Sequence, residues 1–211
     1  MDIQRLNSLT QYGSRWVLWV LVVASVIAFA IVIERAIVLW SSRDNVLRIR
    51  RELRTLLGRG DVVGARKCLD LSPSFEASIA RAGLDADAAP SAEERMRSEQ
   101  QVAKLSLERH LGFLGTLGSN APFVGLLGTV IGVVRAFGKL SESSGQVSAG
   151  LLAEIGEALI ATAIGILVAL PAIAFFNFFQ RAIKARLGQS EALYHEVLAY
   201  LKARPDAQDA E

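Results

Sequence analysis

The chain has 211 residues, of which 52% are hydrophobic and 21% are charged, and its formal net charge is +2. This apolar content excludes a disordered chain, and a single cysteine excludes a disulfide scaffold. The small net charge gives no indication of nucleic acid as a partner. The hydrophobic content is high, whereas the charged content is that of an ordinary soluble domain. The charged residues are therefore expected to lie outside long apolar stretches.

The first predicted element is a transmembrane helix over residues 16–40. Residues 16–33 carry no ionisable side chain, and about 20 apolar residues in a helix span a bilayer. A secretory signal peptide cleaved near Ala28 to Ala30 is an alternative, but the apolar run continues past that site. The pattern therefore favours a span, preceded by a short segment over residues 1–15.

The second predicted element is a charged, helical insert over residues 41–110. Its first apolar residues recur at helical spacing: Val46, Ile49, Leu53, Leu56 and Leu57. Asp61 is a candidate N-cap for a helix that extends through Leu69, and Ser91 begins a capping-box pattern. No strong breaker follows Ser91, so one helix from about Ser91 to Phe137 is expected, roughly 70 Å long.

Two further apolar runs predict a second span over residues 111–138 and a third over residues 150–180, joined by a short loop over residues 139–149. Apolar residues at helical spacing continue from the third span to Leu201, which predicts a helical tail within residues 181–211. The chain is therefore predicted to be an all-α membrane protein with three transmembrane helices and long helical extensions.

Basic residues predict the orientation of the spans. The segment 41–109 carries 13 Lys and Arg and the tail after Gln180 carries five, whereas the predicted loop carries only Lys139. Because cytoplasmic loops are enriched in Lys and Arg, we expect the insert and the tail in the cytoplasm, and the amino terminus and the loop outside. These charges are interpreted as solvated helix faces, with docking of a cytoplasmic partner as the alternative.

Small residues distinguish the second and third spans from the first. The positions predicted to pack helices together are Gly125, Gly128, Gly132, Ala161 and Gly165. Small side chains let helix backbones approach closely, which favours a tight bundle or a ring. Ordinary helix packing explains the same pattern without further function. Pro171 removes one helix hydrogen bond and is predicted to kink the third span, in either a packing or a gating role.

Glu157 is the candidate functional residue of the third span, because it lies on the same helix face as the small residues. A carboxylate at membrane depth is costly and normally faces a bundle interior or a watery cavity, where it can take up and release protons. The alternative is that Glu157, like Glu154, only marks a helix end. Thr129 and Thr162 are the other polar groups at this depth. Each hydroxyl either bonds back to its own helix or contributes to a water-filled path beside Glu157.

No spacing typical of a metal or cofactor site occurs, since His110, His195 and Cys68 stand apart in the sequence. No P-loop, Rossmann or nucleophile-elbow motif is present either, so the chain is not expected to be an enzyme or to use a cofactor. Energy for any work must come from elsewhere, and a membrane potential supplies about 2.3 kcal/mol per charge per 100 mV.

Two passages of the chain resemble a known family. Residues 120–137 read NAPFVGLLGTVIGVVRAF, and residues 150–179 read GLLAEIGEALIATAIGILVALPAIAFFNFF. They resemble the MotA/TolQ/ExbB proton-channel family, and most closely its ExbB and TolQ branch. The shared patterns are GLxGTVxGxxxAF and IxEALxATAIGxxxAxPAxxxxN, in this order and separated by a short loop.

The resemblance implies a bacterial inner-membrane protein that forms a ring of five copies, a homopentamer, around a pair of ExbD/TolR-like single-span partner helices. In that family the residues matching Glu157, Thr129 and Thr162 line the central pore, and the proton-binding aspartate belongs to the partner. Proton-motive force would then drive rotation or rearrangement of the partner helices. A TonB/TolA-like or other envelope-spanning protein and membrane lipid are further expected contacts. The powered envelope process stays open between outer-membrane transport, envelope integrity and motility.

Two other functions stay open at this point. A structural membrane scaffold without proton conduction predicts tolerance at Glu157, Thr129 and Thr162, and sensitivity to bulky residues at Gly128 or Gly132. A small-solute transporter fits less well, because one charged residue on each pore-lining surface leaves little for substrate recognition.

Overall fold

The computed structural model describes residues 15–42, 44–86, 88–142 and 149–203, and every regular element in these ranges is an α-helix. The parts of the predicted terminal segments and loop that fall on residues 1–14, 143–148 and 204–211 lie outside the described residues. The chain divides into two units. The first lies within Met1–Ile33 and His110–Phe178, and the second lies within Glu34–Arg109 and Phe179–Glu211.

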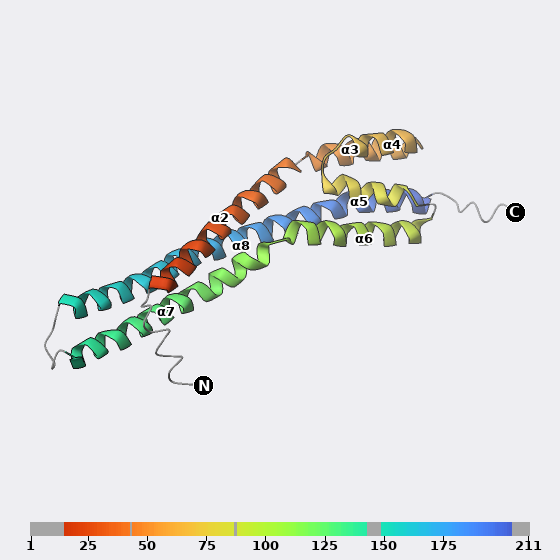
Figure 1. Ribbon diagram of the computed structural model, residues 1–211. Coiled ribbons are helices and arrows are strands. Elements are labelled where there is room, and N and C mark those ends of the chain that lie inside the picture. Colours follow the sequence, from red (N-terminus) through yellow and green to blue (C-terminus); the bar gives the residue numbers. More distant parts are fainter. Residues whose placement is uncertain (1–14, 43, 87, 143–148, 204–211) are drawn as a thin grey trace. The chain divides into compact units, whose positions relative to one another are not determined.

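Three helices are long and apolar enough to cross a membrane. They are α2 (Arg15–Ser41), α7 (Leu111–Glu142) and α8 (Ala149–Ala203), labelled in Figure 1. The all-α class with three candidate spans is thereby confirmed, and so is the continuation of the third span into a helical tail. Helix α7 continues past its predicted end at residue 138 as far as Glu142.

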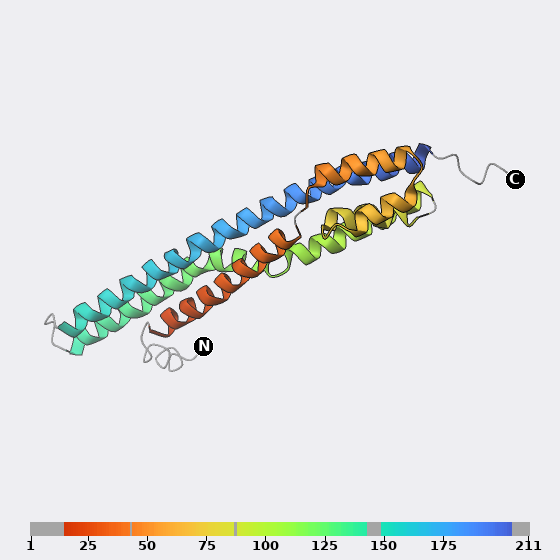
Figure 2. The same ribbon diagram turned by 90° about the horizontal axis from the view of Figure 1, so that it is seen from above.

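In the first unit, α7 and α8 lie side by side, and the first part of α2 packs against them (Figure 1, Figure 2). Their buried cluster consists of Val17, Leu21, Ala121, Ile131 and Ala169. Large apolar side chains on the other faces are exposed, including Trp19 at 70%, Phe29 at 66% and Phe123 at 67%. Because soluble proteins rarely expose apolar surface of this extent, these faces suit lipid or neighbouring subunits.

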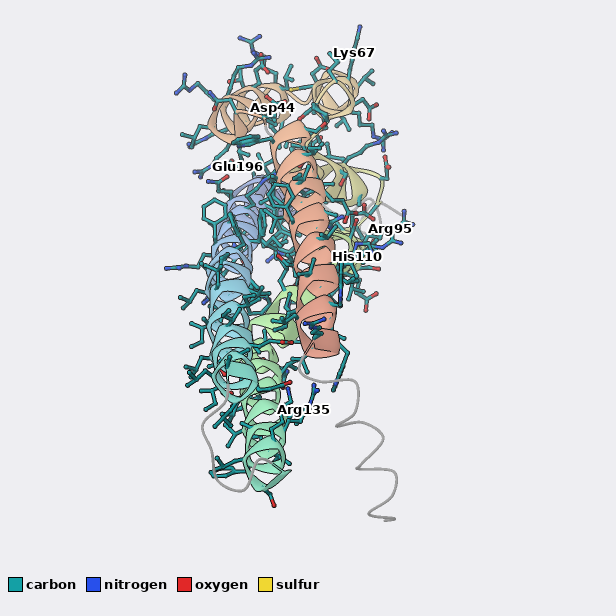
Figure 3. All side chains as sticks on the ribbon, turned by 60° about the vertical axis from the view of Figure 1, so that its left-hand side comes forward. Asp44, Lys67, Arg95, His110, Arg135 and Glu196 are labelled. Carbon is teal, nitrogen blue, oxygen red and sulfur yellow. The ribbon has the colours of Figure 1, made fainter. Side chains whose placement is uncertain are left out.

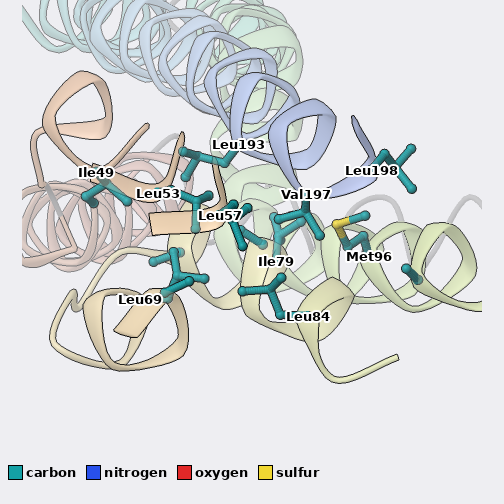
Figure 4. Packing of buried hydrophobic residues seen from close by; sticks show 14 of the residues in the cluster. Ile49, Leu53, Leu57, Leu69, Ile79, Leu84, Met96, Leu193, Val197 and Leu198 are labelled. Atoms are coloured by element: carbon teal, nitrogen blue, oxygen red, sulfur yellow. The ribbon is translucent and has the colours of Figure 1, made fainter. Parts of the chain in front are cut away.

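The second unit contains four helices of the insert together with the last part of α8. The insert helices are α3 (Val46–Gly58), α4 (Val62–Asp70), α5 (Phe75–Leu84) and α6 (Ala89–Glu108). Figure 4 shows their shared core, in which Leu53, Leu69, Ile79, Met96 and Val197 each come from a different helix. Of the predicted apolar face of α3, all members are buried in this core except Leu56, which is partly buried against it. The prediction for α3 is therefore confirmed.

The helix starts in the insert follow the predicted caps only in part. Asp61 caps α4 as predicted, because its side chain accepts a hydrogen bond of 2.7 Å from the Gly64 amide. The prediction that Ser91 caps α6 is wrong. Helix α6 begins at Ala89, and the Ser91 hydroxyl instead donates to the Ala88 carbonyl at 2.9 Å. A proline in the first turn of α6 needs no amide partner, so the helix can start earlier without a side-chain cap.

The single helix predicted from about Ser91 to Phe137 is also wrong, because α6 ends at Glu108 and α7 begins at Leu111. Between the two helices, His110 adopts a φ of 63°. This left-handed conformation is the one that commonly terminates helices. Histidine adopts it more readily than most residues other than glycine, so the sequence carries no conspicuous breaker at this point.

Arg35 of α2 stabilises the end of α6 within the second unit. Its side chain is only 4% exposed and donates to the carbonyl oxygens of Ser106 at 2.9 Å and Leu107 at 3.3 Å. The same guanidinium pairs with Glu34 at 2.7 Å. Carbonyls in the last turn of a helix lack partners inside the helix, and a cation there also interacts favourably with the helix dipole. Arg35 therefore supplies hydrogen-bond donors and a positive charge to the last carbonyl groups of α6.

A second buried arginine, Arg186 of α8, connects three helices of the second unit. Its Nε and one terminal nitrogen each donate to the Glu76 carboxylate on α5 at 2.9 Å. It also donates to the Leu39 carbonyl at 3.2 Å and to the Ser42 carbonyl at 2.5 Å. The guanidinium lies 4.4 Å from the centre of the Phe75 ring. Since Glu76 is 0% exposed and the Arg186 side chain is 11% exposed, this is a largely buried bidentate ion pair.

Candidate functional site

Thr129 of α7 and Thr162 of α8 meet in the first unit. Their hydroxyl oxygens lie 2.5 Å apart. Both hydroxyls also contact the Gly125 carbonyl oxygen, Thr129 at 3.3 Å and Thr162 at 3.1 Å. Thr129 thus bonds back to its own helix, as threonine often does in membrane helices, whereas Thr162 bonds across to the other helix. We refer to Gly125, Thr129 and Thr162 as the hydroxyl cluster.

Glycine residues allow this close approach of α7 and α8. A Cβ atom added to Gly125 would lie 2.8 Å from the Ala161 carbonyl oxygen and 3.0 Å from the Thr162 Cα. One added to Gly165 would lie 2.7 Å from the Ala121 carbonyl oxygen. Real Cβ atoms essentially never lie less than 3.0 Å from another atom, so the two distances to carbonyl oxygens exclude a side chain at either position unless the backbones move apart. The two backbones therefore approach as closely as only glycine permits, directly beside the hydroxyl cluster.

The predicted GxxxG step lies on the same helix contact but meets side chains. A Cβ on Gly128 would lie 2.7 Å from the Ala161 Cβ, and one on Gly132 would collide with the Ala158 side chain. The structure thus places all five predicted small residues at the α7–α8 contact. The closer backbone approach is at Gly125 and Gly165 rather than at the GxxxG step.

Glu157 lies five residues before Thr162 on α8. Five residues correspond to about 140° around a helix axis, so the two side chains leave α8 on different faces. The Glu157 Oε1 lies 3.4 Å from the Arg15 Nε of α2, and 26% of the Glu157 side chain is exposed. The structure therefore brings the two threonines together and places Glu157 on another face, beside Arg15.

Three charged residues meet where α7 ends and α8 begins. The Glu154 Oε1 lies 2.7 Å from the Lys139 Nζ and 3.3 Å from a guanidinium nitrogen of Arg135, which Figure 3 labels. Only 11% of the Glu154 side chain is exposed. Sequence reasoning treats Glu154 as a helix-end residue and does not single out Arg135. The signal that could have found them is the four-residue spacing of Arg135 and Lys139, which puts both on one face of α7.

Pro171 lies inside α8 and lines a cavity of about 160 Å³ in the first unit. All three helices contribute to its lining, through side chains such as Phe29, Leu114 and Val168. Helix α8 is helical on both sides of Pro171, and the kink stays a prediction. Because the lining is almost entirely apolar, this cavity suits side-chain packing better than proton transfer.

Cys68 of α4 lies in the second unit beside Glu52, and its thiol donates to the Glu52 Oε2 at 3.4 Å. Burial is the largest influence that raises the pKa of the Cys68 thiol above its ordinary value of 9.0, followed by the hydrogen bond and the negative charge of Glu52. The positive charge of Arg48 acts in the opposite direction. Among the described residues, no group of three or more His, Cys, Asp or Glu is placed to hold a metal ion.

Replacing Glu52 by glutamine is expected to lower the pKa of the Cys68 thiol. Because the thiolate is the reactive form, alkylation by iodoacetamide at about pH 8 should become several-fold faster, and the midpoint of the pH–rate profile should move to lower pH. Arg48→Gln is the matched variant, and it should move the midpoint to higher pH. Cys68 is the only cysteine, so the rate reports one site. Shifts of both variants in the same direction would contradict this assignment.

The hydroxyl cluster, Glu157 and the small residues of the α7–α8 contact all fall in one segment that matches a known family. Residues 72–192, more than half of the chain, match the MotA/TolQ/ExbB proton channel family. The chain belongs to this family. Family membership confirms the resemblance that the sequence motifs indicate.

Similar proteins place this MotA/TolQ/ExbB family member in the ExbB-like branch. It is 29% identical over 196 residues to the biopolymer transport protein ExbB of Neisseria meningitidis serogroup A, covering 87% of this chain and 89% of that protein. The ExbB protein of Salmonella typhimurium is 32% identical over 191 residues, covering 82% of this chain and 76% of that protein. The putative biopolymer transport protein ExbB-like 2 of Helicobacter pylori is 35% identical over 100 residues, covering 47% of this chain and 67% of that protein.

Family membership also bears on location. Together with three helices able to cross a membrane, it identifies the chain as a multi-pass inner-membrane protein. The side on which each terminus lies stays the prediction made from the basic residues.

Proposed function

We propose that this MotA/TolQ/ExbB family member is a proton-channel subunit that works with an ExbD/TolR-like single-span partner. Five copies form a ring around a pair of partner helices, with the amino terminus outside and the insert and tail in the cytoplasm. Protons that pass between ring and partner drive rotation or rearrangement of the partner helices. The output is work on an envelope process, which a TonB/TolA-like or other envelope-spanning protein transmits. The similarity to biopolymer transport proteins favours transport among such processes.

The observation that carries this proposal is the hydroxyl cluster. The Thr129 and Thr162 oxygens, 2.5 Å apart, put two exchangeable hydroxyl protons into a part of the α7–α8 contact that glycine and alanine residues line. A hydroxyl both donates and accepts hydrogen bonds, so two in sequence can continue a hydrated path. Glu157 lies five residues earlier on a different face of α8, beside Arg15, and a carboxylate at this depth is typical of proton pathways.

The proposed drive is electrochemical rather than catalytic. Each proton that crosses a potential of 100 mV releases about 2.3 kcal/mol, which is comparable with the energy of rearranging a few helix contacts. In this proposal the chain is no enzyme and needs no cofactor. Its side chains hydrate and position the path, and the proton-binding carboxylate belongs to the partner.

Glu157→Gln tests the proposal, because it removes the charge while keeping the size of the side chain. The complex of the variant with its native partner is purified from inner membranes and placed in liposomes under an imposed potential. Proton influx, followed with a pH-sensitive dye, is expected to fall to the level of protein-free liposomes. The inserted amount and the mass of the complex should stay unchanged. Glu191→Gln, at an exposed glutamate of α8 in the second unit, is the control and should conduct normally.

Full proton flux in Glu157→Gln, with normal assembly, would refute the proposal and favour a structural scaffold. A scaffold would also tolerate Thr129→Val and Thr162→Val. It would instead be sensitive to larger residues at Gly128 and Gly132, where an added Cβ meets α8.

A further inference from the structure

A groove in the second unit runs between α3 and the last turns of α8. Two cavities, of about 610 and 250 Å³, share Arg54 and Glu196 in their linings, so they form one continuous depression. It extends along α3 from Leu47 to Gly60, and a helix of this length is about 20 Å long. We refer to it as the arginine groove, because its lining includes Arg50, Arg51, Arg54 and Arg59.

The arginines of the groove outnumber its carboxylates. Among the described residues of the lining, Glu196 is the only acidic one. It pairs with Arg50 at 3.0 Å, and its side chain is 16% exposed. Arg51, Arg54 and Arg59 are exposed and have no ion-pair partner among the residues that the structure describes. These three guanidinium groups are therefore available to bind an anionic ligand.

The groove also offers apolar contacts. Ala199, Tyr200 and Ala203 line it from α8, and Tyr200 packs partly against the buried core of the unit. Gly58 lines it from α3, and a Cβ added there would enter open space in the described structure. The groove thus combines a basic wall with a partly apolar one. Because arginine and tyrosine are enriched in protein interfaces, this combination is typical of a surface that binds another protein.

The shape of the groove favours a peptide over a small ligand. Sites for small molecules enclose most of the ligand surface, whereas the arginines of this groove are exposed. An extended peptide rises about 3.3 Å per residue, so about six residues span roughly 20 Å. Such a segment can place successive carboxylates against the three available arginines and an apolar side chain against Tyr200. Clusters of arginine recognise acidic peptide motifs in this way.

Lipid headgroups lie too far from the groove to be its occupant. The apolar run of the third span ends at Gln180, and Glu196 follows 16 residues later on the same continuous helix. This separation is about 24 Å along the helix axis. The headgroup layer extends only roughly 5–8 Å beyond the hydrocarbon core on each side. An acidic segment of a protein in the surrounding solution therefore fits better.

We propose that the arginine groove is a docking site for an acidic peptide segment of a partner protein on the cytoplasmic side. This side is the one that the basic residues predict for the insert and the tail. The proposal goes beyond proton conduction, since the groove includes neither the hydroxyl cluster nor Glu157. It gives Arg51, Arg54 and Arg59 a role that solvated helix faces would not have.

Binding of a fluorescein-labelled peptide of about six residues, alternating glutamate and leucine, tests the proposal by fluorescence anisotropy. The purified full-length protein in detergent, at about 0.15 M salt, should bind this peptide and should not bind its glutamine counterpart. Arg54→Gln/Arg59→Gln is expected to weaken binding about tenfold, because two exposed ion pairs are lost. Arg95→Gln/Arg97→Gln removes the same charge from exposed positions of α6 and should leave binding unchanged.

Gly58→Leu separates the effect of the groove from that of its charge. The new side chain enters open space and keeps every arginine, so the fold should persist while the peptide loses room. Binding should weaken about tenfold, with the elution volume of the protein unchanged. Full binding by Gly58→Leu, or equal weakening by the two double arginine variants, would overturn the proposal and leave only a generally positive surface.

Other occupants of the groove are outcomes of the same measurement. Residues 205–211 carry Asp206, Asp209 and Glu211. If their removal strengthens peptide binding about tenfold, this segment occupies the groove and the proposal fails. A peptide that lowers the mass of the protein in detergent would make a second copy of the chain the occupant. Binding should be equal in nanodiscs of phosphatidylglycerol and of phosphatidylcholine, and weaker binding in the former would make lipid the occupant.

Discussion

Arg186→Met is expected to lower the free energy of unfolding of the second unit by about 3–5 kcal/mol. The substitution leaves Glu76, which is 0% exposed, without its charge partner. It also leaves the carbonyls of Leu39 and Ser42 without the donor that they now share. A buried charge that loses its partner keeps the full cost of desolvation. The Tm of the purified full-length protein in detergent should fall by about 10 °C.

A matched control for this prediction exists in the same unit. Arg97 pairs with Glu93 at 2.7 Å, but its side chain is 69% exposed. Arg97→Met should therefore cost less than about 0.5 kcal/mol. The double variant Arg186→Met/Glu76→Leu should recover much of the loss, because no buried charge remains. Equal Tm values for Arg186→Met and Arg97→Met would show that the buried pair does not stabilise the unit.

Gly125→Ala is expected to destabilise the first unit by about 1–3 kcal/mol, although alanine is the better helix former. The added methyl would lie 2.8 Å from the Ala161 carbonyl oxygen, and backbone atoms cannot yield as a flexible side chain can. Helices α7 and α8 must therefore separate, which pulls Thr129 from Thr162. The Tm in detergent and the proton influx in liposomes should both decrease.

Gly138→Ala is the control on the same helix. Among the described residues, no atom outside the local helix backbone lies within 4 Å of an added Cβ at Gly138, so the change should be neutral or stabilising. If Gly125→Ala were as stable as Gly138→Ala, the close approach of α7 and α8 would not hold in the protein.

Features that depend on local pattern are predictable from this sequence. The three spans follow from long apolar runs, and the buried face of α3 follows from the helical spacing between Val46 and Leu57. The Asp61 cap follows from the preference of short polar side chains for a free amide at a helix start. Each of these signals lies within one helix or at its start, where residue spacing determines which side chains share a face or reach a free amide.

Features that depend on distant partners are not predictable in this way. Arg186 and Glu76 are separated by 110 positions, and neither has a sequence context that distinguishes it from a solvated charge. Arg35 fills the carbonyls at the end of α6 from 71 positions away. The break at His110 is equally hard to predict, because the left-handed region is uncommon for residues other than glycine.

Some residues of the candidate site are predictable from local pattern, and others depend on distant partners. Motif spacing singles out Thr129 and Thr162, and the contact between their hydroxyls requires the glycine-lined approach of two helices. Glu154 and Arg135 escape sequence reasoning because a carboxylate and an arginine near a helix end are ordinarily solvated. The packing of α7 against α8 brings them together and leaves only 11% of the Glu154 side chain exposed.

The number of hydroxyl hydrogens in the hydroxyl cluster bears on the direction of proton transfer. Two hydroxyl hydrogens serve three oxygen–oxygen contacts, so one contact is always without a hydrogen. If Thr129 donates to the Gly125 carbonyl, Thr162 can donate to Thr129, and the reverse arrangement uses the same number of hydrogen bonds. The hydroxyl cluster therefore has two hydrogen arrangements with the same number of hydrogen bonds, and neither direction of the proposed relay requires an additional hydrogen bond. In the proposed channel, the signs of the membrane potential and of the pH difference would determine the direction of proton flow. Reversing both would reverse the flow.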